Sequence, residues 1–265
     1  DGTGGPAVLR WAGLEAGYGA AQVLFGASGT VRADDTLAVV GVNGVGKTTL
    51  LKTLAGVIAP SRGSIELLGE DITRLSAEER VARGLVLVVG GAGVFRLLTV
   101  EENLALGAWS RTDGAAAIEA TRQRVFALFP NLLERRNTRV ELLSGGEQQM
   151  LTLAMGLMAA PRVLFVDELS LGLAPVVVDR IVTVLNELRR DGLVIVPVEQ
   201  SLSIAARLAD RVATMERGRI VSTRRAEVMH PPAMILAAVW VETAGGTWDF
   251  YYDAATPAVE NLMQA

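Results

Sequence analysis

The strongest constraint on the fold is a glycine-rich loop that ends in a lysine. It matches the pattern G-x-x-x-x-G-K-[ST] and lies between an apolar run, residues 37–40, and a helical pattern. Its glycines let backbone N–H groups turn toward phosphate oxygens, and the helix N-terminus adds a positive dipole end. In this pattern Lys47 reaches the β- and γ-phosphates, and Thr48 offers its hydroxyl to Mg²⁺. The predicted phosphate-binding residues are Gly41, Val42, Asn43, Gly44, Val45, Gly46, Lys47, Thr48 and Thr49.

Short β-branched runs alternate with longer helical patterns along much of the chain. Continuous apolar strands between helices are typical of a parallel sheet that is covered on both faces. The predicted strands of this sheet are residues 37–40, 85–89, 163–166 and 194–196. The fold class is therefore α/β.

The first 70 residues and the middle of the chain follow other patterns. Short strands at 8–11, 22–25 and 64–68 lie between glycine-rich turns and predict an antiparallel subdomain. Residues 100–158 are almost wholly helical in pattern, which predicts a helical subdomain over about 94–158.

Composition excludes several kinds of site. There is no cysteine, which excludes disulfides, thiol nucleophiles and Cys-ligated metals. A single histidine excludes sites that need two imidazoles. The net charge of −4 does not predict nucleic-acid binding. The mean hydropathy is +0.35, yet the longest uncharged run, residues 16–31, is too short to span a membrane, and no signal peptide is visible.

Two adjacent acids follow the predicted strand at 163–166. Ligand-facing residues of a parallel sheet lie at the carboxyl ends of its strands. Asp167 is therefore expected to hold Mg²⁺, and Glu168 to polarise an attacking water as a general base. Paired acids after a strand are also common helix N-caps, but the upstream phosphate loop favours the catalytic interpretation.

A second glycine pair opens another predicted helix. The string Leu143-Ser-Gly-Gly-Glu-Gln-Gln149 precedes a helix over 150–158. Ser144 and the N–H groups of Gly145 and Gly146 would form a second anion site. If both anion sites bind one nucleotide, two chains must face each other head to tail.

Together these strings resemble the nucleotide-binding subunit of ABC transporters over about residues 7–228. Within that superfamily the chain most resembles the second ATPase subunit of branched-chain amino-acid importers, with amide and urea importers close by. The resemblance implies a P-loop NTPase fold of the ABC type, with a RecA-like sheet core. The strings that carry it are 16–19, 98–104, 143–151, 172–175 and 198–200, besides the phosphate loop and the Asp-Glu strand.

The resemblance also implies residue roles. Tyr18 would stack on adenine, Gln200 would take the place of the switch histidine near the γ-phosphate, and residues 170–173 would cross a dimer interface. Lys47, Glu168 and Gln200 would be catalytic, and Thr48 and Asp167 would hold the metal. The residues expected to contact ATP on the opposite subunit are Ser144, Gly145, Gly146 and Glu147.

Several positions depart from the family pattern. The family has Gln or Glu after the second core strand, in contact with the metal, but this chain has Gly90. We expect a weakened metal contact and a looser hinge over residues 90–93. Leu169 replaces the proline that usually follows the acid pair, which we expect to alter loop stiffness modestly. Pro197 is unusual in a central strand, and a local bulge is expected there.

These observations predict an ATP-hydrolysing subunit of an importer for branched-chain or related amino acids or amides. It would pair with a second ABC ATPase subunit, identical or different, and act on integral membrane permeases served by a solute-binding protein. It would be cytoplasmic and peripheral on the inner face of the membrane, without nucleic-acid partners. The alternatives are an ATP-binding regulatory subunit with impaired hydrolysis, which Gly90 motivates, and a non-transport ABC ATPase.

The organisation predicted is a nucleotide-binding domain over 1–227 and an appended tail over 228–265. The tail contains no Lys or Arg but five aromatic residues. It is expected to pack on the parent domain, to contact another subunit or to be a disordered end. His230 is expected to be a solvent or turn residue. Because the first residue is Asp, we expect the chain to be part of a longer one.

Overall fold

The computed structural model describes residues 5–91, 93–168, 170–229, 239–242 and 248–251. The chain divides into two compact units, residues 1–226 and 227–265. In the second unit the described residues comprise the last three residues of α9 (Ala226–Met229) and an antiparallel pair of strands, β11 (Val239–Glu242) and β12 (Trp248–Tyr251). His230 and Leu169 lie outside the described residues, as does most of the predicted tail.

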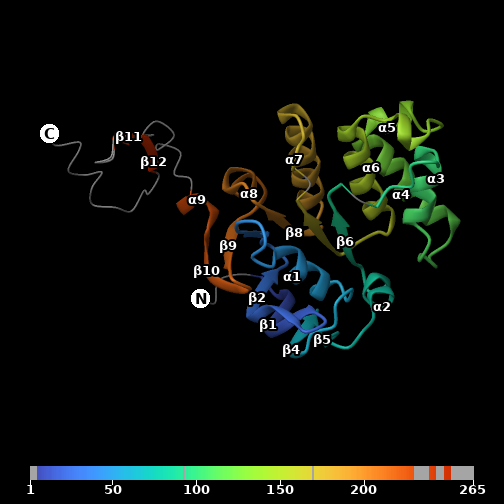
Figure 1. Ribbon diagram of the computed structural model, residues 1–265. Helices are drawn as coiled ribbons and strands as arrows, with labels where there is room; N and C mark the ends of the chain where they lie inside the picture. The colour runs from blue at the N-terminus through green and yellow to red at the C-terminus, as the bar shows by residue number, and fades with distance from the viewer. Residues whose placement is uncertain (1–4, 92, 169, 230–238, 243–247, 252–265) are drawn as a thin grey trace. The chain divides into compact units, whose positions relative to one another are not determined.

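Two sheets form the framework of the first unit (Figure 1). The smaller is antiparallel, in the order β2-β1-β4-β5, and the larger has the order β10-β9-β3-β8-β7-β6. Strands β9, β3, β8, β7 and β6 are parallel, and β10 pairs antiparallel with β9. The strands are β1 (Ala7–Tyr18), β2 (Ala21–Arg32), β3 (Leu37–Val40), β4 (Arg62–Leu67), β5 (Glu70–Asp71), β6 (Leu85–Val89), β7 (Val163–Asp167), β8 (Val194–Glu199), β9 (Arg211–Glu216) and β10 (Arg219–Arg225).

Helices connect the parallel strands and cover them. Figure 1 shows α3 to α6 gathered beside β6, where α6 contacts both β6 and α3. No helix in the described part of the chain is both long and apolar enough for a membrane crossing. The helices are α1 (Lys47–Leu54), α2 (Ala77–Ala82), α3 (Val100–Gly107), α4 (Ala115–Leu128), α5 (Pro130–Glu134), the 3₁₀ turn η1 (Val140–Leu142), α6 (Gly145–Met158), α7 (Pro175–Arg190), α8 (Leu202–Leu208) and α9 (Ala226–Met229).

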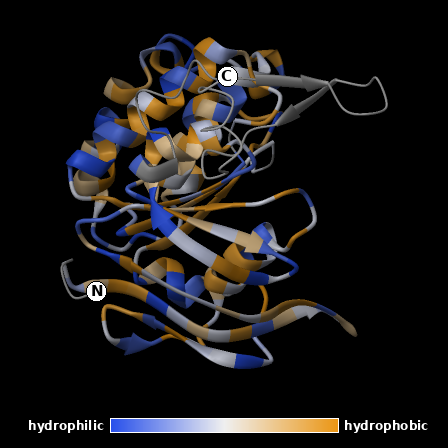
Figure 2. Cartoon of the chain, turned by 90° about the vertical axis from the view of Figure 1, so that its left-hand side faces the viewer, coloured by the Kyte–Doolittle hydropathy of each residue, from blue (hydrophilic) through white to orange (hydrophobic). Residues whose placement is uncertain are grey.

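The parallel strands separate two hydrophobic cores. Successive side chains of β7 point to opposite faces, as the pleat requires. Val163 and Phe165 pack with α1 and the antiparallel sheet, whereas Leu164 and Val166 pack with α6 and α7. The central strands are accordingly hydrophobic throughout, while the helices carry hydrophilic residues as well (Figure 2). The predicted α/β fold with a parallel sheet, an antiparallel subdomain and a helical subdomain is confirmed.

Two local expectations from the sequence were wrong. The helix after the second glycine pair begins at Gly145 rather than at residue 150, because Ser144 and Glu147 form a capping box. The bulge expected at Pro197 is absent: β8 pairs with β7 in continuous register through Val166–Pro197 and Asp167–Val198. Pairing of β8 with β3 begins only at Val198, so the missing N–H of Pro197 interrupts no ladder on that side.

Candidate functional site

The glycine-rich loop joins the carboxyl end of β3 to the first turn of α1. At Gly41 a Cβ would lie 2.5 Å from the Met215 carbonyl oxygen, so the loop passes too close to β9 for a side chain. Gly46 has φ +107, a conformation that favours glycine, and no side chain caps α1 there. The first N–H groups of α1 are therefore available to a ligand at the positive end of the helix dipole.

Lys47 is buried at the start of α1 and its ammonium group lies inside the loop. It is 4 % exposed. Its Nζ donates to the carbonyl oxygens of Gly41 at 2.8 Å and Val42 at 3.2 Å. The same Nζ lies 3.2 Å from Glu168 Oε1. A positive point charge is thus held between the phosphate-binding loop and the predicted general base.

Asp167 ends β7 as a buried carboxylate with one unpartnered oxygen. It is 3 % exposed, and Oδ1 has no hydrogen-bond partner among the described residues. Burial raises the pKa of Asp167, the Thr48 hydroxyl lowers it, and the charge of Glu168 raises it further. One carboxylate beside one hydroxyl suits Mg²⁺, which binds proteins through few carboxylates and takes other ligands from phosphates and water. The residues present therefore fit the implied metal.

Glu168 follows β7 in a backbone conformation that is rare for a residue with a side chain. Its φ is +49, and its N–H donates to the Val198 carbonyl oxygen at 2.9 Å. Left-handed non-glycine residues persist only where surrounding structure holds them, and they cluster at functional sites. Here the turn directs a 22 % exposed carboxylate toward Lys47.

The neighbouring strand β8 ends in a second buried acid that sequence reasoning gave no role. Glu199 is 3 % exposed, and Ser170 donates a hydrogen bond of 2.6 Å to its Oε2. Burial raises the pKa of Glu199 to about 7, with a further contribution from the charge of Glu168. The available signal was its position, since the carboxyl ends of adjacent parallel strands meet at one edge of the sheet. Gln200, the next residue, is exposed.

The second glycine pair begins α6 with an internally satisfied cap. Ser144 Oγ accepts from Glu147 N–H at 3.3 Å and donates to Glu147 Oε2 at 2.8 Å. A Cβ on Gly146 would lie 2.9 Å from Val177, whereas one on Gly145 would meet nothing within 4 Å. Gly146 is therefore needed for packing against α7, and Gly145 leaves the helix N-terminus open to approach.

One cavity of about 420 Å³ brings several predicted residues together. Its lining includes Asp167, Glu168 and Gly90 from the carboxyl ends of β7 and β6, Thr48 from the first turn of α1 and Gly145 from the start of α6. Tyr18 does not border it: this tyrosine is the last residue of β1 and is 50 % exposed.

The segment after β6 is less loose than the sequence suggested. Gly90 N–H donates to the Asp167 carbonyl oxygen at 2.8 Å, and Gly91 N–H donates to Gln149 Oε1 at 3.0 Å. The first two residues of the expected hinge are therefore both tied to their surroundings.

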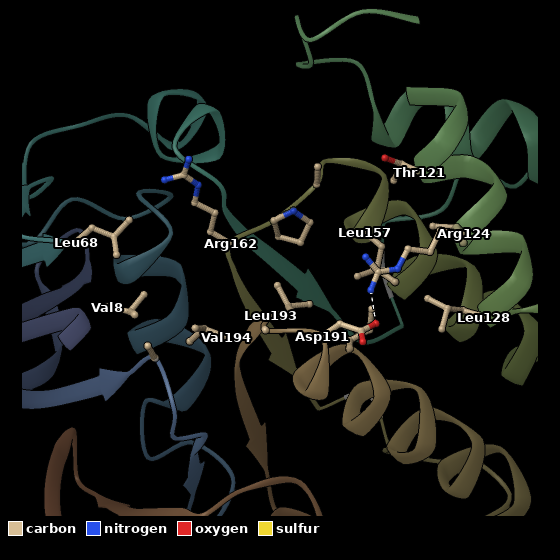
Figure 3. A pocket seen from close by; sticks show the side chains of 16 residues that line it. Val8, Leu68, Thr121, Arg124, Leu128, Leu157, Arg162, Asp191, Leu193 and Val194 are labelled. Carbon is tan, nitrogen blue, oxygen red and sulfur yellow. Dashed lines mark hydrogen bonds and ion pairs between the residues drawn. The ribbon is translucent and has the colours of Figure 1, made fainter. Parts of the chain in front are cut away.

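Another hollow, of about 460 Å³, lies at the amino ends of β7 and β8 (Figure 3). Its wall includes Leu128, Leu157 and Leu193, and an ion pair of 2.5 Å joins Arg124 to Asp191 across it. None of the predicted site residues is among those that line it. The phosphate-binding and acidic residues thus gather at the opposite, carboxyl ends of these strands.

Comparison with known proteins agrees with this geometry. The ABC transporter family profile matches residues 24–170. The chain is 40 % identical over 204 residues to the high-affinity branched-chain amino acid transport ATP-binding protein BraG of Pseudomonas aeruginosa, covering 77 % of this chain and 87 % of that protein. This chain belongs to the ABC transporter family. It is an ATP-binding subunit of a member of that family, whose cassettes are ATPases that couple hydrolysis to transport.

Further relatives extend the agreement. The probable branched-chain amino acid transport ATP-binding protein LivF of Archaeoglobus fulgidus is 34 % identical over 220 residues, covering 80 % of this chain and 90 % of that protein. A crystal structure of a nucleotide-free ATP-binding cassette from an ABC transporter superposes with a TM-score of 0.76 at 23 % identity, covering 83 % of this chain and 92 % of that one. The predicted ABC transporter family is confirmed, as is the predicted resemblance to the ATPase subunits of branched-chain amino-acid importers.

Proposed function

We propose that this subunit hydrolyses ATP to power import of branched-chain amino acids or related amino acids or amides. The observation that carries the proposal is the cluster at the strand ends. There a buried lysine contacts the predicted base, and an unpartnered carboxylate oxygen lies beside Thr48. The role of BraG, and the probable role of LivF, in branched-chain amino acid transport supports the cargo class.

In the proposed reaction each residue has one task. The loop N–H groups and Lys47 bind the phosphates, and Thr48 and Asp167 hold the Mg²⁺. The ion, when bound, neutralises charge that develops on the phosphate oxygens. Glu168 accepts a proton from water, the water oxygen bonds to the γ-phosphorus, and the bond to the β–γ bridging oxygen breaks to leave ADP. Gln200 contributes a side-chain amide near the γ-phosphate, and Tyr18 stacks on adenine.

Two substitutions test this assignment. Lys47→Ala should weaken ATP binding and abolish turnover, because the charge facing the phosphates is lost. Glu168→Gln should keep ATP binding while turnover falls about 10²- to 10⁴-fold, the usual contribution of a general base. Binding of a fluorescent ATP analogue and release of phosphate measure the two effects separately. Unchanged turnover in Lys47→Ala would refute the proposal, and wild-type binding without phosphate release would favour a regulatory subunit.

We further propose that two such subunits, identical or different, bind two ATP molecules between them. In that arrangement Ser144, Gly145, Gly146 and Glu147 of one subunit face the nucleotide held by the other. The open approach to Gly145 supports this arrangement. The pair would act on membrane permeases from the inner face of the membrane. Pull-down of the full chain from cells should recover integral membrane subunits; recovery of ribosomes or DNA instead would contradict the proposal.

A further inference from the structure

The backbone at Gly90 leaves no room for a side chain. A Cβ there would lie 2.5 Å from the Glu168 carbonyl oxygen and 3.0 Å from the Asp167 carbonyl oxygen. Both oxygens belong to the turn that carries the two acids, and Gly90 N–H already bonds to one of them. Residue 90 therefore lies against the catalytic turn without presenting a functional group to it.

A different residue brings an amide to this place. Gln149 lies on α6, is 6 % exposed and accepts a hydrogen bond from Gly91 N–H through Oε1. Its Nε2 lies 3.0 Å from the point that a Cβ of Gly90 would occupy. The side-chain amide thus fills the space beside Gly90, and the Gly91 bond orients it.

The amide and the catalytic turn share one cavity. The carbonyl oxygen of Glu168 lies 2.5 Å, and the Nε2 of Gln149 lies 3.0 Å, from the position that a Gly90 Cβ would take. The two atoms are therefore at most about 5.5 Å apart, a separation that a single water can bridge. Gln149 also lines the cavity of about 420 Å³ with Asp167, whose Oδ1 is unpartnered. A donor from the helical subdomain is therefore close to the two acids and to the expected metal.

We propose that Gln149 is a positioning residue for ATP hydrolysis, supplying from α6 the amide that position 90 lacks. The inference rests on the proposed function. Its Oε1 holds the segment after β6, and its Nε2 orients water beside the Asp167–Glu168 turn. Because α6 begins at the second glycine pair, the same side chain links that helix to the segment after β6, which is itself bonded to the Asp167–Glu168 turn.

The test compares Gln149→Met with Gln148→Met. Methionine keeps the length of glutamine and removes the amide. Gln148 is the matched control because it is the preceding residue of the same helix and lines the same cavity, but its amide donates to the carbonyl oxygens of Val140 and Leu143. We expect Gln149→Met to lower kcat about 10- to 100-fold, as loss of groups that support a metal site typically does. The KM for ATP of Gln149→Met should change less than about threefold. The factor by which kcat falls should be at least about tenfold smaller for Gln148→Met than for Gln149→Met.

A binding measurement keeps the test independent of turnover. The affinity for a fluorescent ATP analogue is measured at increasing concentrations of Mg²⁺. The Mg²⁺ concentration that gives half of the increase in affinity should be several-fold higher for Gln149→Met than for the wild type, and unchanged for Gln148→Met. The inference is overturned if both variants behave alike, or if Gln149→Met matches the wild type in kcat and in Mg²⁺ dependence. If the wild type released no phosphate from ATP, the proposed function would be refuted. The Mg²⁺ titration would still test the role of Gln149 in that case.

Discussion

Glu199 shows how tertiary packing changes the chemistry of a single residue. Its carboxyl group is enclosed at the end of β8, next to the side chains of α7 and α8, and Ser170 donates to it. The charges that act on it most are those of Glu168 and Asp167, which are both negative. Desolvation and like charges both disfavour the ionised form, so the proton is held more tightly in the folded chain than in the unfolded one.

This raised pKa predicts a pH-dependent stability. Glu199 contributes stability fully below its ordinary value of 4.5, and that contribution is lost as pH rises through about 7. The loss is on the order of 3 kcal/mol, since each pKa unit is worth about 1.36 kcal/mol. We expect the free energy of unfolding of the wild type, relative to Glu199→Gln, to fall between about pH 3.5 and about pH 8, each about one unit outside the window from 4.5 to 7.

Urea unfolding of both proteins across that range measures the difference, in which titrating groups that do not interact with Glu199 cancel. Gln keeps an acceptor for Ser170, so the comparison isolates ionisation. A constant difference between the two proteins would contradict the prediction.

Among the elements, α1 and α2 are joined by a buried arginine. Arg80 on α2 is 1 % exposed. Its guanidinium donates to the carbonyl oxygens of Thr53 and Leu54, the last residues of α1, at 2.8 and 2.7 Å. It also donates to the carbonyl oxygens of Thr73 and Leu75. The side chain thus satisfies helix-terminal groups that α1 cannot pair internally.

Replacement of this arginine should destabilise the fold. We expect Arg80→Met to lower the free energy of unfolding by about 3 kcal/mol, because several buried acceptors lose a charged donor. Arg83→Met is the control, since Arg83 pairs with Glu70 on the surface and such a pair is worth about 0–1 kcal/mol. Denaturant unfolding compares the two variants, and equal losses would show that burial of Arg80 does not matter.

At the scale of the whole molecule, the first unit contains everything that the proposed function uses. Both hydrophobic cores are built from residues between Val8 and Ile220, all within 1–226. The phosphate loop, the acids and the second glycine pair lie in the same unit. The residues after 226 add no member to either core in the described part of the chain.

A shortened chain should therefore fold and bind nucleotide. We expect residues 1–226 to melt within a few degrees of the full chain, since a shift of that size corresponds to only about 1 kcal/mol. Affinity for ATP should be unchanged. Circular dichroism melting and nucleotide titration of both chains measure this. A large loss of either property would assign residues 227–265 a role in the folded domain that their composition does not reveal.

The sequence by itself determined the order of the main elements and predicted which residues form the candidate site. Short, β-branched apolar runs such as 163–166 favour buried strands, and the pattern ending in Lys47 is expected between a strand and a helix. Parallel strands align their carboxyl ends, so Asp167 and Glu168 could be placed beside the loop without coordinates. The family roles of Tyr18, Gln200 and the second glycine pair remain predictions, because they concern contacts with a nucleotide or with a second subunit.

Only the tertiary structure decided which side chains meet across distant segments. From the sequence, Gly90 predicted only the loss of a metal contact. In the structure its backbone lies against the Glu168 carbonyl oxygen, and the Gln149 amide lies beside it. No pattern in the sequence assigned a role to Glu199, whereas burial in the folded chain raises its pKa to about 7. Both outcomes depend on distances between residues more than 25 positions apart in the chain, such as the 29 that separate Ser170 from Glu199. Local patterns carry no information about such distances, since packing and desolvation arise only when the segments come together.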